Sequence, residues 1–171
     1  VGYGLGWESY PMSLRIVNWI KWSLINTELK KKWLDSLAIQ TRFLNKNLEY
    51  HLLGNHLFTN AKALIFAGIY FGENIGEIWL KRGLDILKKE LNEQILEDGG
   101  HFELSTMYHS LVLELVLDKL QLAEEASAPK ILAQEAQSYR YTVSIMIEWL
   151  SIMSHPDQEI AFFNDTTGDS G

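Results

Sequence analysis

The sequence predicts an all-α fold. Apolar residues recur at roughly three- to four-residue spacing through most of the 171 positions, which is the period of a helix that buries one face. Glycine, asparagine and proline interrupt these stripes where helices are expected to begin and end. No convincing fixed-length repeat is present. We therefore expect helical hairpins packed side by side, either as a bundle or as an α/α solenoid or toroid.

The first three helices are placed by their start and stop residues. A helix from about residue 11 to residue 26 is expected, because Pro11 suits a first turn. A second helix covers about residues 28–45. It carries Trp33, Leu37, Gln40 and Leu44 at helical spacing. A third runs from Asn55 or His56 to Phe71, and Gly72 supplies the stop.

Three more helices are expected in the second half. The fourth spans about residues 74–94 and ends before the turn Asp98-Gly99-Gly100. Ser105 or Thr106 is a good N-cap for a fifth helix, which ends near Gln121. The last helix follows Pro129 and ends before His155. Its long apolar stripe comprises Leu132, Ala136, Tyr139, Val143, Met146, Ile147 and Leu150.

The helices fit one domain. The segment 159–163 is interpreted as a short strand or an extended stretch, and residues 166–171 as a loose polar end. The expected domain therefore covers residues 1–165.

Composition excludes several classes of protein. A net charge of −7 argues against a nucleic-acid binder, for which a basic surface is expected. The chain has no cysteine, so disulfides, thiolate metal sites and cysteine nucleophiles are excluded. No apolar run reaches the roughly 18 residues of a membrane span, and no signal peptide is visible at the start.

The first expected helix has a face suited to an acidic sugar. Arginine pairs with a carboxylate or sulfate as a planar fork, and an indole ring stacks on a sugar face. This face carries Arg15, Asn18, Trp22 and Asn26, with Trp19 at its edge. The opposite side, with Ile16, Ile20 and Leu24, is expected to face the core. The alternative is that Trp19 and Trp22 pack between helices while Arg15 is solvated.

The second candidate cluster is Asn55 and His56 at the start of the third helix. Free backbone N–H groups and the helix dipole favour an anion at such a position. Thr59 and Lys62 continue the face of Asn55. In the alternative interpretation Asn55 is an N-cap, and His56 is an imidazole with ordinary hydrogen-bond partners.

The third candidate cluster surrounds the Gly99-Gly100 turn. Four polar residues follow this turn within ten positions: His101, Glu103, Tyr108 and His109. Tyr108 is the candidate proton carrier, since a phenol can act as a base when a nearby cation stabilises its charged form. The alternative is a packed tyrosine whose hydroxyl caps a loop.

Metal and cofactor chemistry are not expected. The histidines form no His-x-x-x-His or His-Glu-x-x-His pattern; they are His51, His56, His101, His109 and His155. There is no Gly-x-Ser-x-Gly elbow for a nucleophilic serine and no glycine-rich phosphate loop.

Several strings in order resemble the helical N-terminal part of heparinase II/III-type and alginate-lyase-type polysaccharide lyases. The strings are Gly6-Trp7-Glu8, the segment 11–19, the segment 50–56, the segment 98–103, and Met107-Tyr108-His109. The likeness runs from Trp7 to about Asp165. The spacing from Asn55 to Tyr108 also resembles that between the family's first catalytic residues.

The resemblance implies a fold and a reaction. The fold is part of an incomplete α/α toroid, and the reaction is β-elimination on an acidic polysaccharide or oligosaccharide that contains uronate. Asn55 would neutralise the substrate carboxylate, with help from His56. Tyr108 would be the general acid, or both acid and base for one uronate epimer, and His56 the base for the other. The expected substrate-binding residues are Arg15, Asn18, Trp19, Trp22, His51, His101, Glu103 and His109.

In the family a β-sandwich domain and a further histidine or tyrosine follow this part. The chain stops at Gly171, so we expect a fragment with weak activity alone, whose exposed helix faces favour self-association. The resemblance also implies a periplasmic or secreted location. Two alternatives remain: a non-catalytic domain that binds acidic glycans, and a helical scaffold for protein partners.

Overall fold

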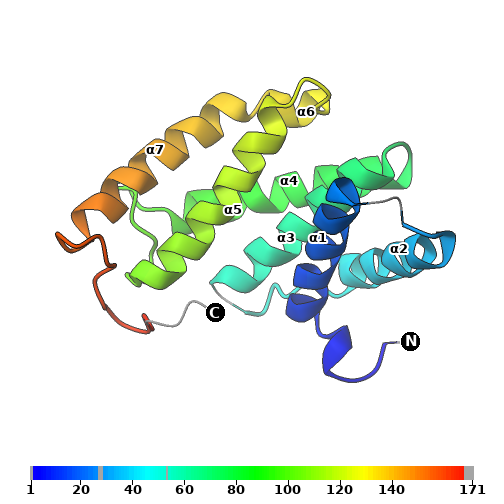
Figure 1. Ribbon diagram of the computed structural model, residues 1–171, viewed down its shortest axis with the longest axis horizontal. Coiled ribbons are helices and arrows are strands. Elements are labelled where there is room, and N and C mark those ends of the chain that lie inside the picture. Colours follow the sequence, from blue (N-terminus) through cyan, green and yellow to red (C-terminus); the bar gives the residue numbers. More distant parts are fainter. Residues whose placement is uncertain (1, 27–28, 53, 168–171) are drawn as a thin grey trace. The chain divides into compact units, whose positions relative to one another are not determined.

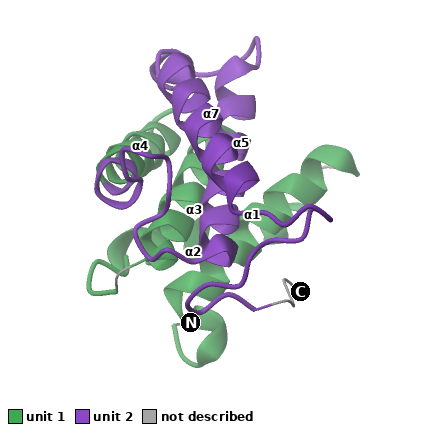
Figure 2. Cartoon of the chain, turned by 90° about the vertical axis from the view of Figure 1, so that its left-hand side faces the viewer, with its two compact units in different colours: residues 1–89 green, residues 90–171 purple. Residues whose placement is uncertain are grey.

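The computed structural model describes residues 2–26, 29–52 and 54–167 of the chain. The chain divides into two compact units, Val1–Lys89 and Glu90–Gly171, which Figure 2 draws in green and purple. The described secondary structure is helical. In chain order the elements are η1 (Leu5–Trp7), α1 (Ser9–Ile25), α2 (Lys31–Lys46), α3 (Asn55–Phe71), α4 (Ile75–Gln94), α5 (Thr106–Glu124), α6 (Lys130–Ala133) and α7 (Ala136–Ile152) (Figure 1).

In the first unit, α1 packs along α3, and α2 contacts both helices (Figure 1). Helix α3 is almost wholly enclosed, with Phe58 and Leu64 at 0% exposure. The start of α4 packs closely on α3. A Cβ atom on Gly68 would lie 2.6 Å from the backbone nitrogen of Leu80, so this position allows only a hydrogen. The aromatic contact between Phe71 and Trp79 extends the same interface.

In the second unit, α5 and α7 lie side by side, with Val116 and Met146 fully buried (Figure 1). After α4 the chain turns back on itself. Residues Ile95 and His101 form an isolated antiparallel bridge, and the N–H of Leu96 donates to the carbonyl of Gly100 at 2.8 Å. This turn leads directly into the start of α5.

The segment after α7 returns to the start of α5. Asn164 donates from Nδ2 to the carbonyl oxygens of Glu103 and Leu104, at 2.9 and 3.1 Å. The hydroxyls of Ser105 and Thr166 lie 2.9 Å apart. Thr166, which the sequence placed in a loose end, is therefore hydrogen-bonded to the start of α5. The last four residues of that end lie outside the described residues.

The helix ends agree closely with expectation at several points. Helix α3 begins at Asn55 and ends at Phe71, and Ser105 is the N-cap of α5, accepting from the N–H of Tyr108. The proposed start of the second helix at residue 28 lies outside the described residues. In the described part of the chain, α2 begins at Lys31.

One helix prediction was wrong. The stripe after Pro129 is divided into α6 and α7, because the N–H of Glu135 donates to the carbonyl of Leu132 at 3.0 Å. That bond spans three residues rather than four, so the α-helical ladder is interrupted there. Ile147, expected in the buried stripe, is 49% exposed.

The side chain of Leu24 is more exposed than expected. Ile16 and Ile20 are buried as predicted, whereas Leu24 is 69% exposed, since it lies in the last turn of α1. Trp33, in the first turn of α2, is 41% exposed. In the segment 159–163, the described ladder is limited to one bridge between Ile160 and Ser154, so it is extended rather than a strand.

Candidate functional site

The start of α3 is built around Gly54. This residue is the N-cap, with φ of 81°, and Asn55 is the first residue of the helix. The alternative in which Asn55 caps the helix is therefore wrong. Among the described residues, none hydrogen-bonds to the side-chain amide of Asn55. Its amide is half-buried and available to a ligand at a helix N-terminus, where an anion is favoured.

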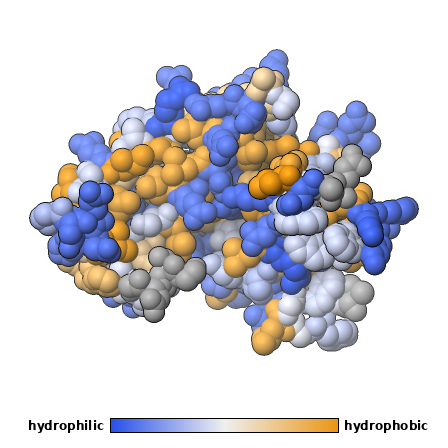
Figure 3. Space-filling view, viewed as in Figure 1, coloured by the Kyte–Doolittle hydropathy of each residue, from blue (hydrophilic) through white to orange (hydrophobic). Residues whose placement is uncertain are grey.

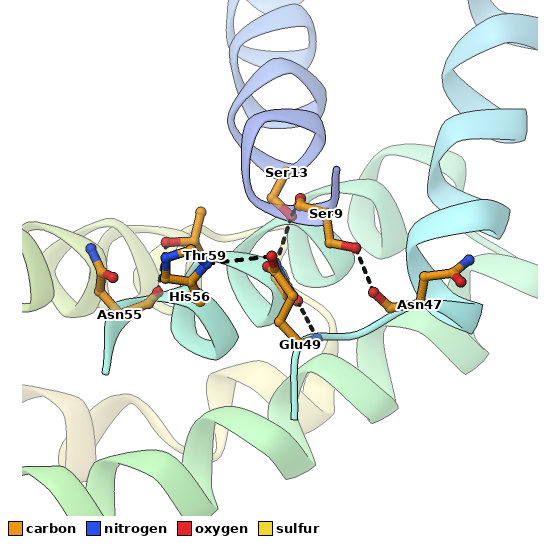
Figure 4. A network of polar contacts seen from close by, with 8 residues as sticks. Ser9, Ser13, Asn47, Glu49, Asn55, His56 and Thr59 are labelled. Carbon is orange, nitrogen blue, oxygen red and sulfur yellow. Dashed lines mark hydrogen bonds and ion pairs between the residues drawn. The ribbon is translucent and has the colours of Figure 1, made fainter. Parts of the chain in front are cut away.

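The neighbouring residue, His56, is held by a carboxylate. Its Nδ1 lies 3.3 Å from Oε1 of Glu49, whose side chain is 12% exposed. The imidazole itself is 37% exposed and lies 4.6 Å from the ring of Tyr10, centre to centre. Figure 4 shows Glu49 on one side of His56, while the Asn55 side chain extends away from it on the other.

Asn60, one turn further along α3, completes this network. Its Nδ2 donates to Oε2 of Glu49 at 2.9 Å and to the hydroxyl of Ser13 at 3.2 Å. Its Oδ1 accepts from the backbone N–H of Glu49 at 3.0 Å. Asn60 is fully buried, so the network ties the segment before α3 to α1 and α3. We refer to Glu49, His56 and Asn60 as the Glu49 network.

A tryptophan-lined groove lies elsewhere on the first unit. It has a volume of about 630 Å³ and is lined by Asn18, Trp19, Trp22, Leu29 and Trp33. The rings of Trp22 and Trp33 lie 6.4 Å apart, and both are partly exposed. Three residues predicted to bind substrate, Asn18, Trp19 and Trp22, therefore share one groove with Trp33.

Arg15 is not among the residues that line this groove. Its Nε donates to Oε1 of Gln40 at 2.6 Å, and one terminal nitrogen donates to the carbonyl of Gly6 at 2.7 Å. Two of its donor groups thus connect η1, α1 and α2. Arg15 was expected to bind substrate, with solvation as the alternative, whereas two of its donor groups make these internal bonds.

In the second unit, Tyr108 lies in the first turn of α5. Its backbone N–H donates to the capping hydroxyl of Ser105, and its side chain is half-buried. Within the described residues its phenol oxygen has no hydrogen-bond partner. The hydroxyl is therefore available as a proton carrier.

His101 and His109 are both at 0% exposure, so their imidazoles meet protein atoms rather than solvent. His101 Nε2 lies 2.9 Å from Oε1 of Gln94, and His109 Nε2 donates to the carbonyl of Met146 at 3.0 Å. Burial lowers the pKa of His101 to about 4, with a smaller effect from His109. Burial also lowers the pKa of His109. Both rings are uncharged at neutral pH.

The remaining predicted residues are at the surface or near it. Burial raises the pKa of Glu103, and the nearby Asp165 carboxylate adds to the effect. His51 is exposed in the turn before α3. In the described part of the chain, no group of three histidine, aspartate or glutamate side chains could hold a metal ion. No described helix is long and apolar enough to cross a bilayer.

Sequence reasoning missed Glu49 and Tyr10. Neither residue has a spacing that marks it, because both reach His56 through the tertiary fold. Asn60 did carry a signal, since a buried amide within an apolar helix needs partners and points to a polar network.

Comparison with known proteins identifies the family. Residues 15–170 match the model of the heparinase II/III N-terminus. The chain belongs to the heparinase II/III family. A heparin-sulfate lyase of Bacteroides stercoris is 34% identical to this family member over 117 residues, which are 68% of the chain. A heparin-sulfate lyase of Pedobacter heparinus is 32% identical over 136 residues, or 79% of the chain.

Solved structures of heparinase II/III proteins have the same fold. The chain superposes on the heparan sulfate lyase HepC from Pedobacter heparinus with a TM-score of 0.68, 26% identity and 94% of its residues covered. It superposes on heparinase III with a TM-score of 0.78, 23% identity and 96% covered. These matches confirm helical hairpins that form part of an incomplete α/α toroid. The chain spans 17% and 20% of the two lyases matched by sequence, and 26% and 27% of the two structures.

Proposed function

We propose that this chain is the N-terminal part of a bacterial polysaccharide lyase, acting on a uronate-containing glycosaminoglycan of the heparan sulfate type. The proposal rests on one observation above all. Gly54-Asn55-His56 and Met107-Tyr108-His109 occur in order and at family-like spacing inside the region matched by the heparinase II/III model. The names of the relatives supply the substrate class, and the resemblance supplies a periplasmic or secreted location.

The reaction is a β-elimination. A base removes the proton on C5 of the uronate, the C4–O bond breaks, and an acid protonates the departing oxygen. The product carries a C4–C5 double bond. Removal of the C5 proton is slow while the adjacent carboxylate keeps its charge, so the enzyme must neutralise that charge. The proposal therefore needs a donor for the carboxylate, a base and an acid.

The residues available fit these roles. Asn55 offers an amide to which no described residue hydrogen-bonds, at the start of α3, and His56 lies beside it. We assign Asn55 to the carboxylate. Tyr108 is assigned as the acid, or as both base and acid when the C5 proton and the leaving oxygen are on the same side of the sugar. His56 is the base for the other epimer. Asn55 and His56 belong to the first unit and Tyr108 to the second.

The other predicted contacts divide into two groups. We assign Asn18, Trp19 and Trp22 to sugar rings bound in the tryptophan-lined groove, and His51 and Glu103 to further contacts with the substrate. His101 and His109 are assigned to the support of the segment that carries Tyr108, since neither is exposed. Arg15 is assigned a structural role, since it connects η1, α1 and α2 through Gly6 and Gln40.

The proposed reaction is tested by the ultraviolet absorbance of the unsaturated product. The chain, and the natural full-length protein that contains it, are incubated with heparan sulfate, heparin and alginate. Absorbance should rise with heparan sulfate and should be lost in Tyr108→Phe, whereas Tyr141→Phe, an exposed tyrosine of α7, should retain it. Unchanged turnover in Tyr108→Phe would exclude the assigned role.

The groove favours a second candidate function. A groove with two partly exposed indole rings can bind a glycan without chemistry. In that case calorimetry would detect binding of acidic oligosaccharides, with no unsaturated product from the full-length protein. The absence of both binding and product would favour a helical scaffold instead.

We also propose that the isolated chain self-associates. Hydrophobic side chains reach the surface of both units among hydrophilic ones (Figure 3). Ile25 is 82% exposed and Ile152 is 74% exposed. Sedimentation velocity over a range of concentrations tests this, and a constant monomer value would contradict it.

A further inference from the structure

We propose that Glu49 is a positioning residue that fixes the tautomer of His56. It keeps the proton on Nδ1 and leaves Nε2 as the nitrogen that meets the ligand. This inference rests on the proposed function, in which His56 contacts the uronate. It adds a residue that the resemblance does not supply and states which atom of the imidazole can act as the base.

The orientation of the Asn60 amide is fixed by its hydrogen bonds. The backbone N–H of Glu49 can only donate, and it points at one end of the Asn60 side chain at 3.0 Å. That end must therefore be the oxygen. The Nδ2 group consequently faces Oε2 of Glu49 at 2.9 Å and the hydroxyl of Ser13 at 3.2 Å. The amide has no freedom to exchange its two ends without losing these bonds.

Both carboxylate oxygens of Glu49 face hydrogen-bonding groups. Its Oε2 accepts from Asn60, and its Oε1 faces Nδ1 of His56 at 3.3 Å. A carboxylate has acceptors only, which means that Nδ1 must be the donor.

The other ring nitrogen of His56, Nε2, is left for the ligand. Tyr10 lies against the imidazole ring at 4.6 Å between centres, which restricts rotation of the ring. Within the described residues, Nε2 has no hydrogen-bond partner. In the uncharged ring this atom carries a lone pair, so it can take the C5 proton. With Nδ1 protonated instead of Nε2, the ring is preset for the role of base.

The tautomer can be observed without any activity. Long-range proton–nitrogen NMR spectra of the ¹⁵N-labelled 171-residue chain distinguish protonated from unprotonated ring nitrogens. The His56 signals are assigned by their loss in His56→Gln. We expect a protonated Nδ1 and an unprotonated Nε2 in the uncharged ring. A protonated Nε2 with a bare Nδ1 would overturn the inference in the wild-type protein itself.

Glu49→Gln provides a second test. The new carboxamide must turn its oxygen toward the fixed Nδ2 of Asn60, which leaves its NH₂ group facing Nδ1 of His56. Nδ1 then has to accept, so the proton should move to Nε2. We expect an inverted tautomer in the spectra, with circular dichroism unchanged. A folded variant that keeps the wild-type tautomer would contradict the inference.

The kinetic consequence separates positioning from general stability. In the full-length protein, Glu49→Gln should reduce kcat at least tenfold on the epimer that uses His56 as base, with little change in KM. The epimer that uses Tyr108 alone should be much less affected. Glu73→Gln, an exposed glutamate between α3 and α4, is the matched control and should change neither value. If the wild type has no lyase activity, the proposed function fails while the spectra still decide the tautomer.

Discussion

Asn60 bonds to Glu49 at two points: its Nδ2 donates to Oε2 at 2.9 Å, and its Oδ1 accepts from the backbone N–H at 3.0 Å. One buried amide thus fixes both the side chain and the main chain of the segment before α3. Its third contact, to Ser13, reaches α1. The stability of this region and the state of His56 are therefore linked.

We predict that Asn60→Leu destabilises the protein by roughly 2 to 4 kcal/mol. Leucine is close to asparagine in size but removes the partners of Oε2 and of the backbone N–H of Glu49. Urea denaturation measures the free energy of unfolding. Asn92→Leu, at an exposed position of α4, should change it by less than about 0.5 kcal/mol. Equal effects of the two substitutions would contradict the role of the network.

Gly68→Ala should also destabilise the protein, even though alanine is the better helix former by about 1 kcal/mol. Its Cβ would meet the backbone nitrogen of Leu80 at 2.6 Å and the carbonyl of Gly76 at 2.8 Å. Separating α3 from α4 costs about 1 to 3 kcal/mol, which exceeds the gain in propensity. Thermal unfolding by calorimetry tests the sign. Asn92→Ala gives the propensity gain without the contact, so its melting temperature should rise slightly.

The stability of the second unit should fall as the pH is lowered below about 6.5, because the unfolded state binds a proton that buried His101 does not. The folded pKa of His101 is about 4, so the loss grows as the pH falls toward that value and amounts to about 3 kcal/mol for this group. The lowered pKa of His109 acts in the same direction.

His101→Gln should reduce this pH dependence, and exposed His155→Gln should not. Urea titrations between pH 5 and 8 provide the comparison. Lower pH is avoided because Glu103, whose pKa is raised by burial, changes the stability in the opposite direction there. Identical slopes in the wild type and His101→Gln would contradict the assignment.

The tryptophan-lined groove should contribute to glycan affinity. Trp33→Ala removes one of two rings that lie 6.4 Å apart and opens the groove. Loss of a stacking surface is expected to weaken binding of heparan sulfate oligosaccharides about tenfold, measured by calorimetry. Tyr141→Ala, at an exposed aromatic position of α7, should leave the affinity unchanged. If Trp33→Ala binds as the wild type does, the groove serves another purpose.

Local signals predicted a large part of the fold. Gly54, Gly72 and Ser105 mark helix ends through backbone geometry and capping, and these act within a few residues. The division between α6 and α7 was not predictable from the apolar stripe after Pro129, since the spacing of apolar residues does not reveal one tightened turn. The exposure of Leu24 depends on where neighbouring helices end, and the spacing of residues along α1 does not contain that information.

The candidate site was predicted less completely. Asn55, His56 and Tyr108 could be proposed because ordered strings carry the family resemblance. Glu49 could not, because its contact with His56 arises only when the segment before α3 folds back over the helix start. For Arg15, charge suggested a ligand contact, whereas the fold satisfies two of its donors internally.

Helix α3 is packed by α1, α2 and the start of α4 along nearly its whole length, from Leu57 to Gly68. A library of random variants across this stretch would mostly return misfolded protein, whatever glycan was used for selection. Segments at its margins, such as the turn that holds His51 and the rim formed by Trp22 and Trp33, tolerate change far better. Engineering of a new sugar preference should begin at these margins and leave the buried residues of α3 unchanged.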